Sequence, residues 1–526
     1  MLFTRQSHIR DVLLLALGAG LYTLAAPPYE WSGAAWLALT PFYLVLHDKT
    51  PKSAFWVGVV FGLLFSAGLA SWVYFSIATF FPVSPVVAVL GALFVYLVFV
   101  SPYTGLVAVG SCLLMRQGSG LRWIGIPALW VSGEFARALF SGFAWELLGY
   151  TQYRQLPLIQ ITDVTGVYGL SCLLALSGYI GAECLRAVRF PHPSLRGLPW
   201  PALSVLTLGI LLIWLYGIQR LDSYKRVANP AASSLKVAVV QGDGTDERRW
   251  QPAHYASTLL RYAQATRQGV RHAHPDLIVW PEFAVGFYLN KNHMLRSQLG
   301  WLTRSLRAPL LLGAPRREHT PAGQHYYNSA YLLAPGGQIL GVYDKMQLLP
   351  FAEYRPWGLP ALLPHNTTYP SQFTAGEQTQ VFDFSSASAS HRLGVMICYE
   401  VTSPSLVRRL AEEGAQVLVN ISNDGWLAAG GLAAPAQHFS MAVIRAVENR
   451  RPLVRATTSG ISGFVDPTGR PSRLSVQEQG VLLGTVTPRQ ELSVYTQYGD
   501  WFAWLCMGVG VLSCVWRVGG WRQAWH

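Results

Sequence analysis

The chain has 526 residues, of which 51% are hydrophobic and 13% charged, and its formal net charge is +13. That length leaves room for more than one domain. The basic residues lie mostly in short loops between apolar segments, and not in a stripe with interleaved aromatic residues, which excludes nucleic acid as an expected partner and indicates membrane topology.

Eight apolar segments are predicted to cross a membrane, because a spanning helix needs about 20 apolar residues. They run approximately over 11–27, 33–47, 54–80, 85–114, 122–140, 165–185, 202–219 and 500–518. The second is short and the fourth is long. The first has basic residues before its apolar run, as a signal peptide does. No small-residue cleavage site ends it, so we expect a retained anchor.

The loops between these segments alternate in charge, which predicts their orientation. Lys and Arg gather in every second loop, at Arg5, Arg10, Lys49, Lys52, Arg116, Arg122, Arg186, Arg189, Arg196, Arg517 and Arg522. The positive-inside rule then places both termini in the cytoplasm and residues 220–499 on the outer side, which is the periplasm of a Gram-negative cell. Three parts follow: a seven-helix membrane domain (1–220), a periplasmic domain (221–499) and a last membrane helix with a short tail (500–526).

Few ionisable residues lie within the apolar segments, which disfavours a transporter or proton pump. Glu134 and Arg137 are the main exception. Three residues apart on a helix, they are expected to pair. The aromatic stretch 141–165 is expected to lie at the membrane interface.

The periplasmic part alternates strands and helices, which is typical of a layered α/β domain. Strands are predicted at 235–241, 276–280, 309–314, 328–333, 338–343, 393–397, 416–422, 453–458 and 463–465. Helices are predicted at about 254–270, 299–306, 403–413 and 437–449. Catalytic groups in such folds lie where strands end. Glu282, Lys345 and Cys398 each follow a predicted strand, so we expect one shared site.

Cys398 is the only cysteine between the apolar parts, so it has no disulfide partner there. Most free cysteines only pack, but a thiol at the end of a strand and before a helix faces a cleft. As a nucleophile it needs a base. Glu282 can serve if burial raises its pKa, and Lys345 and the backbone N–H of Tyr399 can stabilise an oxyanion. If the three residues form no shared site, Glu282 is instead expected to cap a helix and Lys345 to be a solvated charge in a loop.

Other chemistry has little support in the sequence. No histidine has an obvious position as partner of Cys398, although spacing does not exclude His391 or His438. The histidines lack a paired metal-ligand spacing, and no glycine-rich phosphate loop precedes a helix in the outer domain. We therefore expect neither a metal nor a cofactor.

Three motifs resemble the Glu–Lys–Cys site of the carbon–nitrogen hydrolase (nitrilase) superfamily over about residues 235–490. They are WPEF at Trp280–Phe283, YDKMQLLPFAEYRP at Tyr343–Pro356 and MICYE at Met396–Glu400. The resemblance implies an αββα sandwich with Glu282 as base, Lys345 as electrostatic stabiliser and Cys398 as nucleophile. It also implies a second glutamate, Glu353, near the cysteine.

Joined to the apolar segments, the whole chain resembles the apolipoprotein N-acyltransferase family of the bacterial inner membrane. VVQGD at Val239–Asp243, YNSA at Tyr327–Ala330, SNDGW at Ser422–Trp426 and the segment Arg445–Gly460 carry this resemblance. It implies that an acyl chain passes from a phospholipid sn-1 ester through a Cys398 thioester to the α-amino group of a diacylglyceryl lipoprotein. The lipid bilayer is then a further partner.

Other residues are expected to shape this site. Trp250 would help to close the substrate entrance, Tyr399 and Glu400 would line the pocket, and Trp426–Ala436 would be either a mobile lid or a plain flexible loop. Arg220, Lys225 and Arg226 would meet phospholipid head groups. Two alternatives stay open: a membrane-tethered amidase that uses water as acceptor, and a transporter or scaffold with an inactive enzyme fold.

Overall fold

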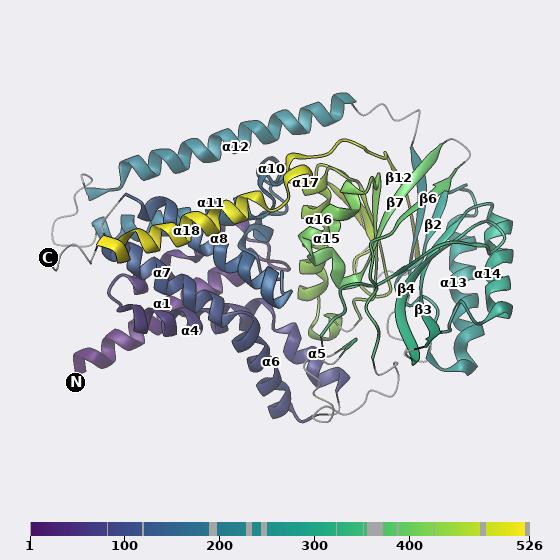
Figure 1. The fold of residues 1–526 in the computed structure, drawn as a ribbon, viewed down its shortest axis with the longest axis horizontal. Helices are drawn as coiled ribbons and strands as arrows, with labels where there is room; N and C mark the ends of the chain where they lie inside the picture. The colour runs from purple at the N-terminus through teal and green to yellow at the C-terminus, as the bar shows by residue number, and fades with distance from the viewer. Residues whose placement is uncertain are drawn as a thin grey trace. The chain divides into compact units, whose positions relative to one another are not determined.

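The computed structural model describes residues 2–81, 83–117, 120–188, 197–227, 234–242, 250–321, 323–350, 352–354, 372–386, 389–425, 427–473 and 480–520, with side chains from His8 to Val515. Its contacts divide the chain into two units (Figure 1). The first comprises 1–77, 84–222 and 498–526, and the second comprises 78–83 and 223–497. Arg189, Arg196, Arg522 and Trp426, which the sequence analysis singled out, lie outside the described residues.

The first unit is helical. The helices that lie wholly or mainly in it are α1 (Leu2–Ala25), α2 (Ala35–Ala38), α3 (Thr40–Leu46), α4 (Pro51–Leu69), α5 (Trp72–Phe80), α6 (Pro85–Phe99), α7 (Ser101–Gln117), α8 (Arg122–Ser141), α9 (Leu156–Ile159), α10 (Thr162–Thr165), α11 (Tyr168–Val188), α12 (Trp200–Val227) and α18 (Trp501–Gly520).

Helices α4 and α7 pack closely because small residues line their contact. A methyl group added to Gly58 would lie 2.4 Å from the carbonyl oxygen of Thr104 and 2.7 Å from the Cα of Gly105. Gly62, one turn further along α4, faces Ser101 and Thr104 in the same way. Small residues four apart let helix backbones approach each other where apolar side chains alone give little specificity.

Fewer helices of this unit have the length and composition of a membrane span than the eight predicted. Four do so among the described residues: His8–Ala25, Pro51–Leu69, Tyr168–Val188 and Trp200–Arg226. A fifth results if α6 and α7, which meet at a bend of 42°, count as one broken span. The predicted segments 33–47 and 500–518 contain shorter apolar helices, Ser32–Leu46 and Trp501–Val515. The structure therefore supports a unit with four or five apolar helices of spanning length.

The predicted pairing of Glu134 with Arg137 is replaced by other contacts. Arg137 forms an ion pair with Glu146 at 3.2 Å and donates to the carbonyl oxygen of Trp145 at 2.8 Å. Glu134 accepts hydrogen bonds from the indole of Trp130 and the backbone of Leu148. The segment after α8 thus brings a carboxylate to Arg137 that helical spacing could not reveal.

The second unit contains two six-stranded sheets, in the orders β12-β1-β2-β3-β4-β5 and β11-β10-β9-β8-β7-β6. The strands are β1 (Leu235–Gln241), β2 (Leu277–Val279), β3 (Leu310–Thr320), β4 (Gly323–Leu333), β5 (Ile339–Asp344), β6 (Val381–Ser385), β7 (Ser390–Ile397), β8 (Val417–Ser422), β9 (Leu453–Thr457), β10 (Gly463–Val465), β11 (Pro471–Arg473) and β12 (Gly480–Val486). Its helices are α13 (Tyr255–Gly269), α14 (His293–Leu306), α15 (Pro404–Glu412), α16 (Ala433–Asn449) and α17 (Val494–Tyr498).

These elements form four layers. Helices α13 and α14 cover one sheet and α15 and α16 cover the other, with the sheets facing each other between them (Figure 1). The expected αββα sandwich is therefore confirmed. Strand β1 shows why the sequence is apolar along its whole length: Val237 and Val239 enter the core between the sheets, whereas Ala238 and Val240 pack with α13. A strand buried on both faces has no polar side.

The sequence did not reveal β6, β11 and β12, because these strands lie at or near sheet edges and bury fewer side chains. Edge strands need no continuous apolar run. Strands β3 and β4 also extend beyond the predicted limits. Their polar ends, Arg316–Thr320 and Gly323–Tyr327, pair as the arms of a hairpin.

Leu418 gives a test of this packing, since its side chain is wholly buried in β8, a central strand. We expect Leu418→Ala to lower the free energy of unfolding by about 2–5 kcal/mol, because it removes buried methyl groups and leaves a cavity. Leu340→Ala, at a side chain 46% exposed, should change it by less than about 1 kcal/mol. Urea unfolding of the purified protein measures both. Equal losses would contradict the assigned layers.

Candidate active site

Glu282 lies just beyond β2, in a turn that the surrounding residues hold closely. Trp280, at the start of this turn, is buried and donates its indole N–H to Thr266 at 3.0 Å. Phe283 has a left-handed backbone, with φ of 48°. Gly313 of β3 runs directly beneath, and a methyl group there would lie 2.6 Å from the Cα of Glu282. The turn therefore depends on a glycine at 313.

Lys345 follows β5 directly, and its side chain is 1% exposed. Its Nζ atom lies 2.7 Å from Oε2 of Glu353 and 3.5 Å from Oε1 of Glu282. Its backbone is bonded on both sides, to the carbonyl of Asn328 and to the N–H of Gly376. One ammonium group thus lies between two carboxylates in a site with little access to water.

Asn328, on β4, links the same two carboxylates. Its Nδ2 atom donates to Oε1 of Glu282 at 2.7 Å and to Oε1 of Glu353 at 2.8 Å. Only the amide nitrogen can face two ionised carboxylates, so this contact fixes the orientation of the amide. The backbone N–H of Asn423 donates to the other oxygen of Glu282 at 2.7 Å. These bonds hold Glu282 in one position.

Cys398 follows β7 with a left-handed backbone, φ of 52°, and is 3% exposed. A non-glycine residue in this conformation is held there by its surroundings, and such residues often occur at functional sites. The sharp turn leads into a short 3₁₀ helix, Cys398–Thr402, and then into α15. Cys398 is one of six cysteines, all free of disulfide bonds.

Glu400 ties the cysteine turn to the loop after Lys345. Its Oε2 accepts from the N–H of Ile397 at 2.7 Å. Its Oε1 accepts from the hydroxyl of Tyr343 and from the backbone of Met346, each at 2.7 Å, and of Gln347 at 3.1 Å. The carboxylate of Glu400 is wholly buried and accepts these four hydrogen bonds, which join the ends of β5 and β7. Glu400 therefore shapes the site by fixing the backbone around Cys398 and after Lys345.

The electrostatics of the site favour a resting, protonated thiol. Burial raises the pKa of Cys398 far above its usual value, and the negative charge of Glu282 raises it further, whereas Lys345 acts in the opposite direction. Burial also raises the pKa of Glu282 above 4.5, with Lys345 lowering it and Glu353 raising it. Burial alone would lower the pKa of Lys345, but Glu353 and Glu282 raise it, so the ammonium stays charged.

The remaining predicted site residues divide by position. Trp250 packs edge-on against Phe283, the neighbour of Glu282, with ring centroids 4.8 Å apart. Tyr399 is 8% exposed and adjoins Cys398. Of the predicted lid, 427–430 is a 3₁₀ helix and α16 begins at Ala433, so a shorter segment than expected lacks helical structure. His391 lies at the other end of β7, where it contacts Ser386.

The sequence reasoning assigned no role to Asn328, Asn423 or Gly313. Asn328 and Asn423 occur in the quoted YNSA and SNDGW motifs. A polar residue inside or just after an apolar strand was the available signal for both. The need for glycine at position 313 could not be predicted, because only the structure shows that the backbone of the Glu282 turn passes directly over it.

Comparisons with known proteins place both parts of the chain among known families. A family model described as the apolipoprotein N-acyltransferase N-terminal domain matches residues 18–180, and a carbon–nitrogen hydrolase model matches residues 236–491. The apolipoprotein N-acyltransferase of Geobacter metallireducens is 36% identical over 517 residues, which cover 96% of this chain and 95% of that protein. That of Azotobacter vinelandii is 34% identical, covering 98% and 96%.

Among solved structures, an amidase from Nesterenkonia sp. is 24% identical, with a TM-score of 0.35. The match covers 51% of this chain and 93% of the amidase. The fold assignment rests on the sheet order above and on the carbon–nitrogen hydrolase model.

The carboxylate pair predicts a distinctive pH dependence. A general base works only when ionised, so activity should fall as the pH drops through the pKa of Glu282, which lies above 4.5. Glu353→Gln removes a negative charge that opposes this ionisation and leaves Lys345 to interact more with Glu282. Both effects lower the pKa of Glu282, so the acidic limb of kcat/KM should move to lower pH.

The pH profile of activity measures this shift, normalised for the lower absolute rate of the variant. Glu413→Gln, at an exposed carboxylate, is the control and should leave the acidic limb of the profile at the same pH. A limb that moves to higher pH in Glu353→Gln would show that Glu282 is not the base.

Proposed function

We propose a two-step acyl transfer for this chain, which belongs to the apolipoprotein N-acyltransferase family. In this proposal it transfers a fatty acyl group from a phospholipid to the N-terminal amine of a lipoprotein, through a thioester on Cys398. The observation that carries the proposal is the buried cluster of Glu282, Lys345 and Glu353 at the strand ends beside a strained cysteine.

In the first step, Glu282 removes the thiol proton as the sulfur of Cys398 attacks the sn-1 ester carbonyl. The new S–C bond forms a tetrahedral intermediate whose oxyanion is stabilised by Lys345 and the backbone N–H of Tyr399. The ester C–O bond then breaks. Glu282 returns the proton to the leaving glycerol oxygen, so a lysophospholipid departs and a thioester remains.

In the second step, the α-amine of an S-diacylglyceryl cysteine attacks the thioester carbonyl. Glu282 accepts a proton from the amine and passes it to the departing sulfur, which restores the thiol and releases the amide. Lys345 stays protonated throughout, because two carboxylates stabilise its charge. The thioester must survive between the steps, and the 3% exposure of Cys398 limits attack by water.

The helical unit supports a membrane setting for both substrates. We assign residues 1–220 and 500–526 to a bilayer domain of eight spans in all, with both termini cytoplasmic and residues 221–499 periplasmic. The four or five helices of spanning length support the membrane assignment, and the alternating loop charges support the orientation. Trp250 beside Phe283, and the segment that leads into α16, would border the entrance for acyl chains.

The rival function is a membrane-tethered amidase that uses water as its acceptor. The trio of catalytic groups serves both reactions equally well. The apolar helices favour the acyltransferase, because a soluble amide substrate needs no membrane platform. Full-length similarity to apolipoprotein N-acyltransferases favours it further.

Intact-mass measurement tests the first step. The purified protein, incubated with a phospholipid of defined sn-1 chain, should gain the mass of one acyl group, located at Cys398 by peptide mapping. Cys398→Ala should gain none, and Glu282→Gln should form the adduct about 10²–10⁴ times more slowly, because it lacks the general base.

Cys172→Ala, which removes a cysteine of the helical unit, is the matched control and should acylate normally. Addition of a diacylglyceryl peptide should then discharge the adduct as an acylated peptide. Release of free fatty acid without peptide acylation would instead establish the amidase-type alternative.

A further inference from the structure

A row of polar side chains crosses the second sheet where apolar ones are expected. Strands β7, β8 and β9 are parallel neighbours, and their register aligns Met396, Asn420 and Arg455. Residues in register share one face of a sheet. The alternate residues of β8 and β9 enter the core between the sheets. Asn420 and Arg455 therefore face the helical layer of α16, and both are wholly buried.

Stability alone does not explain these residues. A buried arginine must be paired, and an apolar row of similar volume is often as stable or more so. Here Arg455 forms an ion pair with Asp424, 2.8 Å between Nη2 and Oδ2, and Asp424 also accepts from Ser422 at 2.6 Å. Both charges are fully buried. Such a network can be retained because it fixes one geometry.

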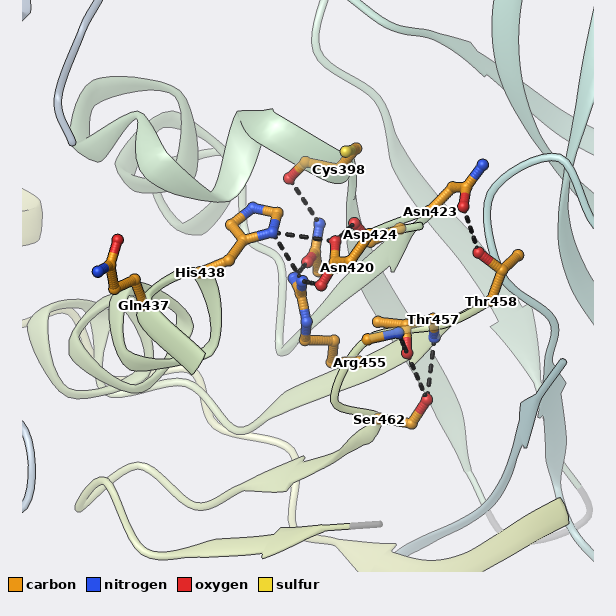
Figure 2. A network of polar contacts seen from close by, with 12 residues as sticks. Cys398, Asn420, Asn423, Asp424, Gln437, His438, Arg455, Thr457, Thr458 and Ser462 are labelled. Atoms are coloured by element: carbon orange, nitrogen blue, oxygen red, sulfur yellow. Dashed lines mark hydrogen bonds and ion pairs between the residues drawn. The ribbon is translucent and has the colours of Figure 1, made fainter. Parts of the chain in front are cut away.

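The donors in this network set the direction of every bond. Arginine only donates, so Oδ1 of Asn420, which contacts Nη1 of Arg455, must be the acceptor. The Nδ2 atom of Asn420 then faces the other way, 3.3 Å from the carbonyl oxygens of both Met396 and Cys398 (Figure 2). The ion pair thus determines which end of the amide meets the cysteine turn.

His438 of α16 completes the network without adding charge. Its Nδ1 lies 2.9 Å from Nη2 of Arg455 and 3.1 Å from Oδ1 of Asp424, so the ring contacts both members of the ion pair. Burial and the charge of Arg455 lower the pKa of His438, so the ring is neutral. Asp424 and Arg455 carry opposite charges, and the negative charge of Asp424 contributes to the raised pKa of Cys398.

The carbonyl of Cys398 matters because the peptide bond is planar and trans. When that oxygen is directed toward Asn420, the N–H of Tyr399 must point to the opposite side of the same plane. In Figure 2 the carbonyl oxygen of Cys398 faces the network and the sulfur lies on the other side of the residue. Without such an anchor, a residue at φ of 52° would relax toward more favourable backbone angles.

We propose that Asp424, Arg455 and Asn420 form a positioning relay that fixes the Cys398–Tyr399 peptide plane and thereby aims the Tyr399 N–H at the oxyanion. The proposal rests on the proposed function, since the oxyanion belongs to its tetrahedral intermediates. The three side chains position Cys398 through the carbonyl oxygen that Asn420 binds, and the charge of Asp424 in addition raises the pKa of the thiol. A misplacement of about 1 Å at such a donor can cost about 10²-fold in rate.

Asn420→Leu tests the relay, because it keeps a similar volume and removes both amide contacts. Leu418→Ala is the matched control, at a buried position of the same strand and on the same face. We expect Asn420→Leu to slow single-turnover acylation of Cys398 by about 10²-fold per folded molecule, with little change in the KM for phospholipid. Leu418→Ala should lose stability but keep its acylation rate.

Alkylation of Cys398 by iodoacetamide forms no oxyanion. It therefore distinguishes an effect on the orientation of the Tyr399 N–H from an effect on the reactivity of the thiol. The alkylation rate of Asn420→Leu should stay within a few-fold of the wild type. A parallel loss in alkylation, or equal acylation rates in Asn420→Leu and Leu418→Ala, would overturn the relay. Failure of the wild-type chain to form any acyl-enzyme would instead overturn the proposed function itself.

Gly460→Ala provides a second variant that removes no network atom. An added methyl group at Gly460 would lie 2.2 Å from Oδ2 of Asp424, so it must displace the carboxylate. We expect a smaller loss of acylation, about tenfold, again without a change in alkylation. Gly508→Ala, where a methyl group meets no atom within 4 Å, is its control and should acylate normally. Normal acylation by Gly460→Ala would also overturn the relay.

Discussion

The site depends on one buried ammonium shared by two buried carboxylates. Lys345 holds Glu353 at 2.7 Å and Glu282 at 3.5 Å, and two ionised carboxylates exceed one ammonium by one negative charge, which further hydrogen-bond donors must stabilise. Asn328 and the backbone of Asn423 supply them. Removal of one partner from a buried ion pair costs about 3–5 kcal/mol, because the other charge stays unpaired. The middle of β4 and the segments that follow β2 and β5 are therefore held together by these polar contacts as much as by packing.

A second buried pair has a different relation to the cysteine. The charges of Glu282 and Lys345 act on the Cys398 thiol, whereas Arg455 is linked to Cys398 through Asn420 and a backbone carbonyl. Each cluster is closed by an asparagine whose amide nitrogen faces acceptors, Asn328 in one and Asn420 in the other. The division lets the reacting charges respond to substrate while the geometry of the peptide plane stays fixed.

The sequence predicts those parts of this arrangement that follow from local pattern. Buried strands with polar residues at their ends indicated the α/β layers and brought Glu282, Lys345 and Cys398 to one edge. Edge strands such as β12 were not predicted, because they bury too few side chains to require a continuous apolar run. Arg455 and Asn420 were not singled out from the sequence, although they interrupt otherwise apolar strands, and only the register of β8 and β9 shows that they meet. The ion pair of Arg137 with Glu146 was likewise not predictable, because Glu146 lies in a loop and not at helical spacing from Arg137.

Burial also explains how an unpaired thiol could persist in the oxidising compartment that we propose for this unit. The thiolate is the form that oxidants and electrophiles attack. Because burial raises the pKa of Cys398 well above its usual value, the resting thiol stays protonated and unreactive. In the proposed mechanism, reactivity then requires a carbonyl carbon beside the sulfur, since only then would proton transfer to Glu282 accompany bond formation next to the charge of Lys345. The same dry environment that suppresses oxidation would also slow hydrolysis of the proposed thioester, so one physical property would protect Cys398 both before and after acylation.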